Sequence, residues 1–421
     1  MFVTDQLPHR VDGSQSWRGG PKAAQEVQLQ LSIMATAQTA DAAAVPWRQE
    51  LREWLEAHAP RDLRGPDELG TSEPHRAWER TLYEAGYAAI HWPQEFGGWG
   101  ADALARMIFQ EEYERAGAPD RINIQALMLA GPVLMQFGTQ EQRDRWLMPM
   151  LRCEEVWCQG FSEPGAGSDL GALRTHGRVD GEELVINGQK IWTSYASYSD
   201  WIFLLVRTDP QAAKHAGITW VMVDMATAGL EVRPLRQMNG SSDFAEVFFT
   251  DVRVPLWNVV GGLGDGWRIA MAALNLERGP GRRSYVRYLR NLNTLKSFVD
   301  SSGMTRDPSV QEDVGDLFAS VMAYRHYMSR VVDDLRSTGD SDVARINKLY
   351  WSELQAKLFE TGMGVLDERA GFLDDGDSIP GAAAWRNEYW YSRASLIFGG
   401  TNQIQKNIIA ERLLGLPRGG S

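Results

Sequence analysis

The spacing of apolar and polar residues divides the chain into three blocks. In residues 44–151 apolar positions recur at the spacing typical of amphipathic helices. Within 47–59, for example, Trp47, Leu51, Trp54 and Leu55 share one helical face, and charged residues lie opposite. The same spacing predicts further helices at 101–117, 123–137 and 139–150, the last of them opened by a Thr cap.

Apolar and polar residues alternate in the second block, residues 155–255, as they do in β-strands. The pairs Asp180–Gly181 and Asn187–Gly188 are typical of tight turns, so we expect them to separate short strands. Short strands joined by such turns favour a small barrel or sandwich. Further strands are predicted at 200–206, 218–223, 230–234 and 245–250.

Helical spacing returns from residue 264 to the end of the chain. The order helix, strand, helix predicts a multi-domain α+β protein with three domains: an α-helical domain at 46–154, a β domain at 155–263 and a helical domain at 264–421. Interfaces between domains favour cofactor pockets. Helices of the last block are predicted at 267–278, 282–297, 309–336, 343–366 and 383–397.

Composition narrows the class of protein. The 421 residues are 43% hydrophobic and carry a formal net charge of −12, which argues against nucleic acid or an acidic membrane as partner. Two cysteines cannot form a disulfide framework, and no apolar run approaches the ~20 residues of a membrane span. We therefore expect a cytoplasmic protein. Residues 1–45 are polar and rich in Gly and Gln. We expect them to form a disordered extension, and the alternative is an arm that binds a partner protein.

The first stretch with candidate chemistry runs from Gln159 to Asp169 and reads QGFSEPGAGSD. It supplies the hydroxyls of Ser162 and Ser168, and its glycines leave backbone N–H groups unobstructed. Such a loop can wrap the polar edge of a ring system or hold an anion. Taken alone, it could equally be a tight turn.

Two further stretches bear on the same question. On a predicted strand, Trp192 offers a flat face beside the hydroxyls of Thr193 and Ser194, although a Trp on a sheet is usually part of the core. Near the end of the chain, Gly399 and Gly400 precede a polar, amide-rich helix start. Such a glycine pair lets backbone approach something flat or phosphorylated, but it could also simply break the chain before a capped helix.

Glu277 is the candidate acid or base. It lies within a predicted helix next to Arg278, and Pro280 should break or kink that helix beside it, because Pro lacks an N–H and clashes with the carbonyl four residues back. A carboxylate at a helix break can lean into a cavity. The alternative is a surface Glu–Arg pair worth less than ~1 kcal/mol.

Together these segments resemble the acyl-CoA dehydrogenase family, in the family's order and spacing, from about Trp47 to Gly419. The resemblance implies an α-helical domain, a β-barrel-like domain and a C-terminal four-helix bundle that enclose FAD, with the bundle also building a tetramer. The motifs that carry it are WPQEFGG at 92–98, FGTQEQ at 137–142, SEPGAGSD at 162–169, INGQKIWTS at 186–194, DVRVP at 251–255 and GTNQIQ at 400–405.

The resemblance also implies roles for the residues of the first loop. Phe161, Ser162 and Ser168 match positions that line the flavin ring and its chain. Gln159 stands where family members often have an aromatic or other flavin-contacting residue.

Two later segments match further cofactor positions. Trp192, Thr193 and Ser194 resemble the segment on the far side of the ring, with the Ser194 hydroxyl at the position that approaches flavin N5. Thr401 and Gln403 resemble contacts to the ribityl–diphosphate region.

Family members remove the α-proton of an acyl-CoA with a carboxylate while the β-hydrogen leaves as hydride for the flavin. Many carry that Glu where this chain has Gly399, whose N–H would still match the group that polarises the thioester carbonyl. Isovaleryl-CoA and long-chain types place the base just before an Arg on the helix that opens the C-terminal domain. The resemblance therefore implies Glu277 as the base.

Two family signatures are missing or degraded. The Arg-x-x-Phe-Gly signature that reaches a neighbouring subunit's FAD is absent from 285–302, and the adenine-binding glycine stretch is degraded at 358–364. Besides a homotetramer or homodimer, we therefore expect a heteromer with a related chain, in which the FAD site is completed by the partner. A paralogue without catalysis is the third alternative. The resemblance implies an electron-transfer flavoprotein as acceptor, while oxygen as acceptor and a carrier-protein substrate stay open.

Overall fold

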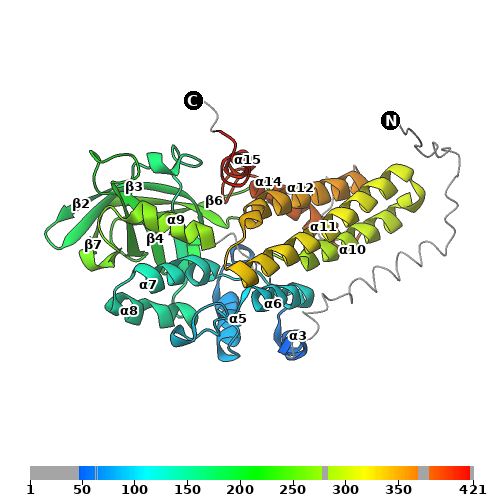
Figure 1. The fold of residues 1–421 in the computed structure, drawn as a ribbon, viewed down its shortest axis with the longest axis horizontal. Helices are drawn as coiled ribbons and strands as arrows, with labels where there is room; N and C mark the ends of the chain where they lie inside the picture. The colour runs from blue at the N-terminus through cyan, green and yellow to red at the C-terminus, as the bar shows by residue number, and fades with distance from the viewer. Residues whose placement is uncertain (1–46, 62, 64, 277–282, 368–378, 418–421) are drawn as a thin grey trace, which may run out of the picture. The chain divides into compact units, whose positions relative to one another are not determined.

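Helices flank a central β-sheet region in the order that the hydrophobic pattern predicts (Figure 1). The computed structural model describes residues 47–61, 63, 65–276, 283–367 and 379–417. The expected extension at 1–45 lies outside the described residues, and so does Glu277. From Glu50 onward the described residues belong to one compact unit.

The N-terminal region is helical, as predicted. Asp102 caps its longest helix by accepting a hydrogen bond from the Ala105 N–H at 2.8 Å. The predicted Thr cap of the last helix is confirmed, because the Thr139 hydroxyl accepts from the Gln142 N–H while the Gln142 side chain accepts from the Thr139 N–H. The helices are α3 (Trp47–His58), α4 (Pro66–Leu69), α5 (Glu73–Glu84), α6 (Ala103–Ala116), α7 (Gly131–Phe137) and α8 (Gln140–Leu151).

The regular helix predicted at 123–137 is wrong in part. Ala126–Ala130 forms a π-helical turn, and α7 begins only at Gly131. The carbonyl of Leu127, within that turn, accepts a hydrogen bond from Trp92 Nε1 at 2.8 Å. A Cβ at Gly131 would overlap the Trp92 ring. The Trp92 side chain from the WPQEFGG loop therefore sets the local form of this helix, which the helical spacing alone does not reveal.

The central region is one eight-stranded sheet in which β6, β7, β3, β2, β4, β5 and β8 are neighbours in that order, and β1 pairs with β4. Most pairs are antiparallel, whereas β1–β4 and β2–β4 are parallel. The predicted turn at Asp180–Gly181 joins β2 to β3. The strands are β1 (Trp157–Gly160), β2 (His176–Asp180), β3 (Glu183–Ser194), β4 (Trp201–Arg207), β5 (Ile218–Asp224), β6 (Leu230–Leu235), β7 (Phe244–Pro255) and β8 (Val259–Val260).

The second predicted turn, Asn187–Gly188, is wrong. Both residues lie inside β3, at a shift in its register with β7. Gly188 has φ 148° and packs on Thr175, where a Cβ would overlap. The Asn187 side chain exchanges hydrogen bonds with Asp251 at 2.9 and 3.0 Å. A pair that favours turns therefore serves here as a bulge within a long strand.

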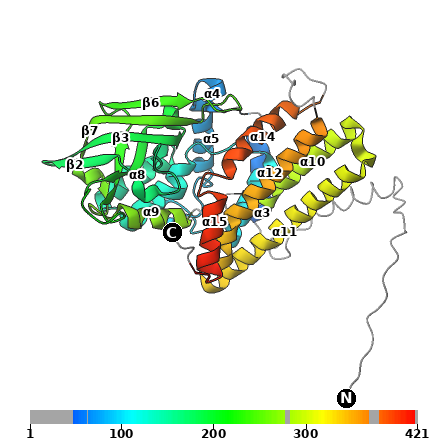
Figure 2. The same ribbon diagram turned by 90° about the horizontal axis from the view of Figure 1, so that it is seen from above.

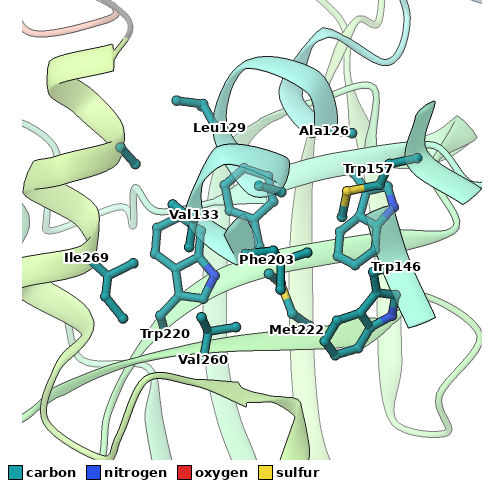
Figure 3. Close-up of a cluster of buried hydrophobic side chains, with 14 of the residues drawn as sticks. Ala126, Leu129, Val133, Trp146, Trp157, Phe203, Trp220, Met222, Val260 and Ile269 are labelled. Atoms are coloured by element: carbon teal, nitrogen blue, oxygen red, sulfur yellow. The ribbon is translucent and has the colours of Figure 1, made fainter. Parts of the chain in front are cut away.

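A shared core joins the N-terminal helices, the sheet and the first C-terminal helix (Figure 3). Trp146 of α8 meets Trp157 of β1 edge-on, with ring centroids 6.0 Å apart. Phe203 of β4 stacks on Trp220 of β5 at 5.1 Å. Ile269 of α9 (Gly266–Leu276) belongs to the same buried cluster. This core fixes β1 and the loop that follows it against the helices.

Helices α10, α11, α12 and α14 pack side by side around a second core in the C-terminal region (Figures 1 and 2). Ser284 is extended and caps α10, so this helix begins at Tyr285 rather than at residue 282 as predicted, and the break predicted beside Glu277 lies outside the described residues. Residues 342–346 form a 3₁₀ turn before α12 rather than its first turn. The helices are α9 (Gly266–Leu276), α10 (Tyr285–Ser302), α11 (Pro308–Thr338), α12 (Asn347–Leu366), α14 (Ala382–Ser395) and α15 (Asn402–Ile408). Among the described residues, no helix has both the length and the apolar character to cross a membrane.

Candidate functional site

A buried ion pair ties the loop after β1 to the middle of β3. Lys190 Nζ lies 2.8 Å from Glu163 Oε1 and also donates to the carbonyl of Phe161 at 3.1 Å. The Glu163 carboxylate accepts further hydrogen bonds from the backbone N–H groups of Arg174 and Thr175, at 2.6 and 2.9 Å. The Glu163 carboxylate therefore attaches the loop to Lys190 of β3 and to the backbone of Arg174 and Thr175.

The same contacts shift both pKa values. Burial lowers the pKa of Lys190 to about 8, although the Glu163 carboxylate opposes that shift. For Glu163, burial alone would raise the pKa, but the Lys190 ammonium and the backbone donors outweigh burial and lower it. Near neutral pH the pair is therefore charged on both sides.

Backbone contacts complete the attachment of this loop. The Ile191 N–H donates to the Ser162 carbonyl at 3.0 Å, and Glu163 and Ala166 exchange backbone hydrogen bonds across a tight bridge. Ser162 is half-buried, whereas Ser168 is exposed beyond the bridge. The stretch predicted from the sequence is thus a tight turn and also a loop built onto the strand that carries Trp192.

The backbone of β3 turns Trp192 outward. A shift in the register between β3 and β7 lies between Lys190 and Thr193, and Trp192 adopts φ 62°, a left-handed conformation that is uncommon for bulky residues. As a result 59% of Trp192 is exposed, and it is not part of the sheet core. Thr193 is buried, and its hydroxyl has no hydrogen-bond partner among the described residues. Ser194 is half-buried at the end of the strand.

A series of aromatic rings leads from Trp192 to the C-terminal glycine pair. Trp192 meets Phe244 edge-on at 6.1 Å, and Phe244 stacks on Tyr391 of α14 at 6.5 Å. Tyr391 in turn lies 6.4 Å from Phe398, the residue before Gly399. Segments about two hundred residues apart in sequence are therefore neighbours at one site.

Gly399 and Gly400 both have left-handed backbone, with φ 64° and 85°. A Cβ added at Gly399 would meet no atom within 4 Å, and its N–H donates to no acceptor found in the described part of the chain. Gly400 has the opposite surroundings, because a Cβ there would collide with the Gln405 side chain. Gln405 Nε2 donates to the Gly399 carbonyl at 2.9 Å, which fixes the turn.

Thr401 and Gln403 follow the glycine pair on α15. The Thr401 hydroxyl caps this helix by accepting from the Ile404 N–H at 3.2 Å. The Gln403 side chain is exposed. The Thr401 side chain is therefore already hydrogen-bonded within the protein, whereas the Gln403 side chain is available to a ligand.

Two predicted residues are set back from the ring series. Phe161 is buried, and its ring meets Phe203 and Trp220 edge-on at 5.9 and 5.3 Å, so its side chain belongs to the core. Gln159 is half-buried on β1, paired with Phe203 of β4.

Sequence reasoning assigned no role to Lys190, Glu163, Phe244 or Tyr391. Glu163 lies in the motif at 162–169 and Lys190 in the motif at 186–194. A Lys in an otherwise alternating strand is a signal that a buried partner exists, because unpaired buried charges are rare.

Comparisons with known proteins agree across the chain. Family models for the acyl-CoA dehydrogenase N-terminal, middle and C-terminal domains match residues 43–154, 158–252 and 264–414. Acyl-CoA dehydrogenase IpdE1 of Mycobacterium tuberculosis is 39% identical over 382 residues, which cover 88% of this chain and 97% of that protein.

Solved structures are also similar. The Tcur3481-Tcur3483 steroid ACAD matches with a TM-score of 0.75 and 28% identity over 95% of this chain and 99% of its own. The ChsE4-ChsE5 complex from Mycobacterium tuberculosis matches with a TM-score of 0.75 and 29% identity over 89% of this chain and 99% of its own.

Proposed function

This chain belongs to the acyl-CoA dehydrogenase family, and from that membership we propose how its own residues oxidise an acyl-CoA thioester to the trans-2-enoyl product. The observation that carries the proposal is the geometry at Gly399. Its N–H has no acceptor among the described residues, and the space where a side chain would begin is open. Residue 399 can therefore donate its backbone N–H to a ligand, but it offers no carboxylate.

The residues of the site fit a flavin. Trp192 presents a large exposed ring, the Ser194 hydroxyl is one residue beyond the bulge, and Gly165 and Gly167 have open space where side chains would stand. When bound, FAD would supply the acceptor for the β-hydrogen as hydride. We assign Trp192, Thr193, Ser194, Ser162, Ser168, Gln159 and Phe161 to the ring side, and Thr401 and Gln403 to the ribityl–diphosphate side.

These assignments differ in how directly the side chain can act. Trp192, Ser168 and Gln403 are exposed enough for their side chains to contact the cofactor. Phe161 and Thr193 are buried, so Phe161 would act through its backbone and through the loop that it anchors. The unpartnered Thr193 hydroxyl is a donor that a bound group could satisfy.

In this proposal Glu277 is the base that removes the α-proton of the substrate. The chain offers no carboxylate at Gly399, and the Glu–Arg pair at 277–278 matches the second place where family members carry the base. The α-proton would move to the Glu277 carboxylate while the Gly399 N–H donates to the thioester oxygen and stabilises the charge that develops there. A single carboxylate also avoids the repulsion that would raise the pKa of two close ones.

Flavin bleaching tests the assignment of the base. In Glu277→Gln protein that is co-expressed with its partner chain and loaded with FAD, anaerobic reduction by a panel of acyl-CoAs should be at least ~10²-fold slower, the scale of a lost general base. Near-normal reduction would exclude Glu277. The double variant Glu277→Gln/Gly399→Glu is the matched control, because no atom lies within 4 Å of a Cβ at residue 399, although its left-handed backbone, with φ 64°, strains any side chain placed there. It should recover part of the rate if the two positions serve one task.

The assembly and electron acceptor are part of the same proposal. The missing FAD signatures at 285–302 and 358–364 favour a heteromer with a related chain over a homotetramer or homodimer, and two similar solved structures carry the names of two chains each. An electron-transfer flavoprotein in the cytoplasm would reoxidise the flavin. Protein purified alone should then be colourless and turn yellow on co-expression with its partner. Yellow protein from the single chain would contradict the heteromer, and absence of bleaching in every pairing would favour a non-catalytic paralogue.

A further inference from the structure

The turn that contains Gly399 and Gly400 is fixed at its ends. Ser395 and Asn402 are buried, whereas the residues between them, all of which the structure describes, are half-buried or exposed. The Asn402 N–H donates to the Leu396 carbonyl at 3.0 Å and so closes the loop across the two glycines. The position of the Gly399 N–H therefore depends on where Asn402 is held.

The side chain of Asn402 connects this loop to α12, which lies beside α15 (Figure 2). Its Oδ1 atom accepts hydrogen bonds from Lys348 Nζ at 2.7 Å and from the Ser352 hydroxyl at 3.0 Å. Lys348 and Ser352 are four residues apart, so they share one face of α12. Asn402 is only 6% exposed, and a buried acceptor that loses its donors is costly. One amide oxygen thus joins the glycine turn to the bundle.

The ammonium of Lys348 is placed for this contact. Lys348 lies in the first turn of α12, where a positive charge opposes the helix dipole. Glu353, on the same helix, pairs with Lys406 of α15 at 3.4 Å, whereas the partner of Lys348 among the described residues is the neutral Asn402 amide. Burial lowers the pKa of Lys348 to about 8 against the opposing effect of Glu353, so the donor is still charged at neutral pH. A charged donor makes a stronger hydrogen bond than a neutral one.

The packing of α12 has other sources. Leu354, Leu358 and Phe359 of this helix belong to the buried core of the bundle. The Phe359 carbonyl also accepts a hydrogen bond from Trp385 Nε1 of α14 at 3.0 Å. Removing the Lys348 ammonium should therefore disturb the glycine turn more than the bundle.

We propose that Lys348 is a positioning residue, which acts through Asn402 to hold the turn that presents the Gly399 N–H to the thioester oxygen. The inference rests on the proposed function, in which this N–H stabilises the charge that develops on that oxygen. Such stabilisation requires a donor that is fixed before the reaction, so a loosened turn weakens it. Lys348 itself contacts neither the substrate nor the flavin in this proposal.

Infrared difference spectroscopy measures this polarisation without any chemical step. The FAD-loaded complex with the partner chain would bind the enoyl-CoA products of the acyl-CoA panel, each isotope-labelled at the thioester carbonyl carbon. A hydrogen bond to the carbonyl oxygen lowers its stretching frequency, so the band in the wild type should lie below that of the free thioester. Lys348→Met should lose at least half of this shift, whereas Lys348→Arg keeps a charged donor and should retain most of it.

Flavin reduction provides a second measurement. At saturating acyl-CoA it should be about 10-fold slower in Lys348→Met, less than the loss expected when an oxyanion donor is removed outright. The KM should change less than kcat, because the misplaced N–H acts mainly in the transition state.

A graded set of variants isolates the Asn402 oxygen. Ser352→Ala removes the second donor and should shift the band less than Lys348→Met, because the charged donor remains. The double variant Lys348→Met/Ser352→Ala should shift it most. The matched control is Lys406→Met, which removes an exposed lysine of α15 that pairs with Glu353 and should leave the band where it is in the wild type.

A band at the wild-type frequency in Lys348→Met would overturn the proposal, because the lysine would then serve only the stability of the bundle. An equal shift in Lys406→Met would also overturn it, since a general change in charge would explain both. If Lys348→Met does not fold, Lys348→Gln, whose shorter side chain carries no charge, takes its place. An unshifted band in the wild type with every ligand would instead overturn the Gly399 donor itself, and the proposed function with it.

Discussion

Lys190 and Glu163 form a salt bridge of 2.8 Å between a fully buried ammonium and a nearly buried carboxylate. It joins β3 to the loop that follows β1, just where Trp192 leaves the sheet. The same loop carries a second pair, Lys214–Asp169, at 2.6 Å, but there the side chains are 52% and 61% exposed. Two ion pairs of similar geometry thus anchor one loop in different surroundings, which allows the effect of burial to be measured.

Removing the buried cation should be costly. Lys190→Met leaves the Glu163 carboxylate without its charged partner, and breaking a buried pair in this way typically lowers the free energy of unfolding by ~3–5 kcal/mol. Lys214→Met should lower it by less than ~1 kcal/mol, because solvent screens the exposed pair. Urea denaturation of both variants measures the difference. Similar values for the two variants would show that burial is not what makes the first pair matter.

The double variant Lys190→Met/Glu163→Gln separates loss of the ion pair from loss of packing. A neutral amide oxygen at residue 163 can still accept from the Arg174 and Thr175 N–H groups. The double variant should therefore be more stable than Lys190→Met alone. If it is less stable, the cost in the single variant does not come from the uncompensated charge.

Acid should weaken this loop through Glu163. The Lys190 ammonium and the backbone donors outweigh burial and lower the pKa of Glu163 from 4.5. A carboxyl group whose pKa is lower in the folded than in the unfolded state stabilises the fold above its unfolded pKa, and this contribution is lost as the pH falls through the folded value. The difference in unfolding free energy between the wild type and Glu163→Gln should therefore shrink between pH 7 and the acid range below ~4.5. A difference that stays constant over that range would contradict the assigned pKa shift.

Trp192 should matter for the cofactor more than for the fold. Because 59% of Trp192 is exposed, Trp192→Ala should change the free energy of unfolding by about 0.5 kcal/mol or little more. If its ring stacks on the flavin, the variant should bind FAD about 2–10-fold more weakly, the equivalent of ~0.5–1.5 kcal/mol, and Trp192→Phe should lose less. Fluorescence titration with FAD, run on the apo form of the complex with the partner chain, measures the affinity of both variants, and urea denaturation measures their stability.

A second tryptophan provides the control for that experiment. Trp257 is 43% exposed and stacks on the buried Trp146 with centroids 4.9 Å apart. Trp257→Ala should therefore lower stability while FAD affinity stays as in the wild type. Weaker FAD binding in Trp257→Ala but not in Trp192→Ala would exclude the stacking role of Trp192.

Local rules predicted the features that depend on neighbours in sequence. The Thr139 cap and the turn at Asp180–Gly181 are of this kind, since each is decided within a few residues. The turn predicted at Asn187–Gly188 failed because the conformation there is set by Thr175 on another strand, against which a Cβ would not fit. Lys190 and Glu163 are 27 residues apart, and no periodicity reveals that they meet. Sequence could identify the segments of the site, but not which side chains turn inward to hold it together.

Two glutamines on α15 test whether residues that stabilise the site can be separated from residues that bind the cofactor. Gln405 is buried and donates to the Gly399 carbonyl at 2.9 Å, whereas Gln403 is exposed and is assigned to the cofactor. Gln405→Leu should lower the free energy of unfolding by ~1–3 kcal/mol, because a carbonyl in the turn loses its donor, and should slow flavin reduction by loosening Gly399.

Gln403→Leu should show the opposite pattern. With its side chain already in solvent, its stability should stay within ~0.5 kcal/mol of the wild type, while the dissociation constant for FAD rises. Urea denaturation and FAD titration of the two variants test this contrast. Only Gln405→Leu should lose stability, whereas Gln403→Leu should lose affinity for FAD because a direct contact is removed. If Gln403→Leu binds FAD as tightly as the wild type, residue 403 is not part of the cofactor site. Thr401 would then be the one residue of this segment that remains assigned to the cofactor. Thr401 already caps its helix, so its hydroxyl would then have to serve two partners.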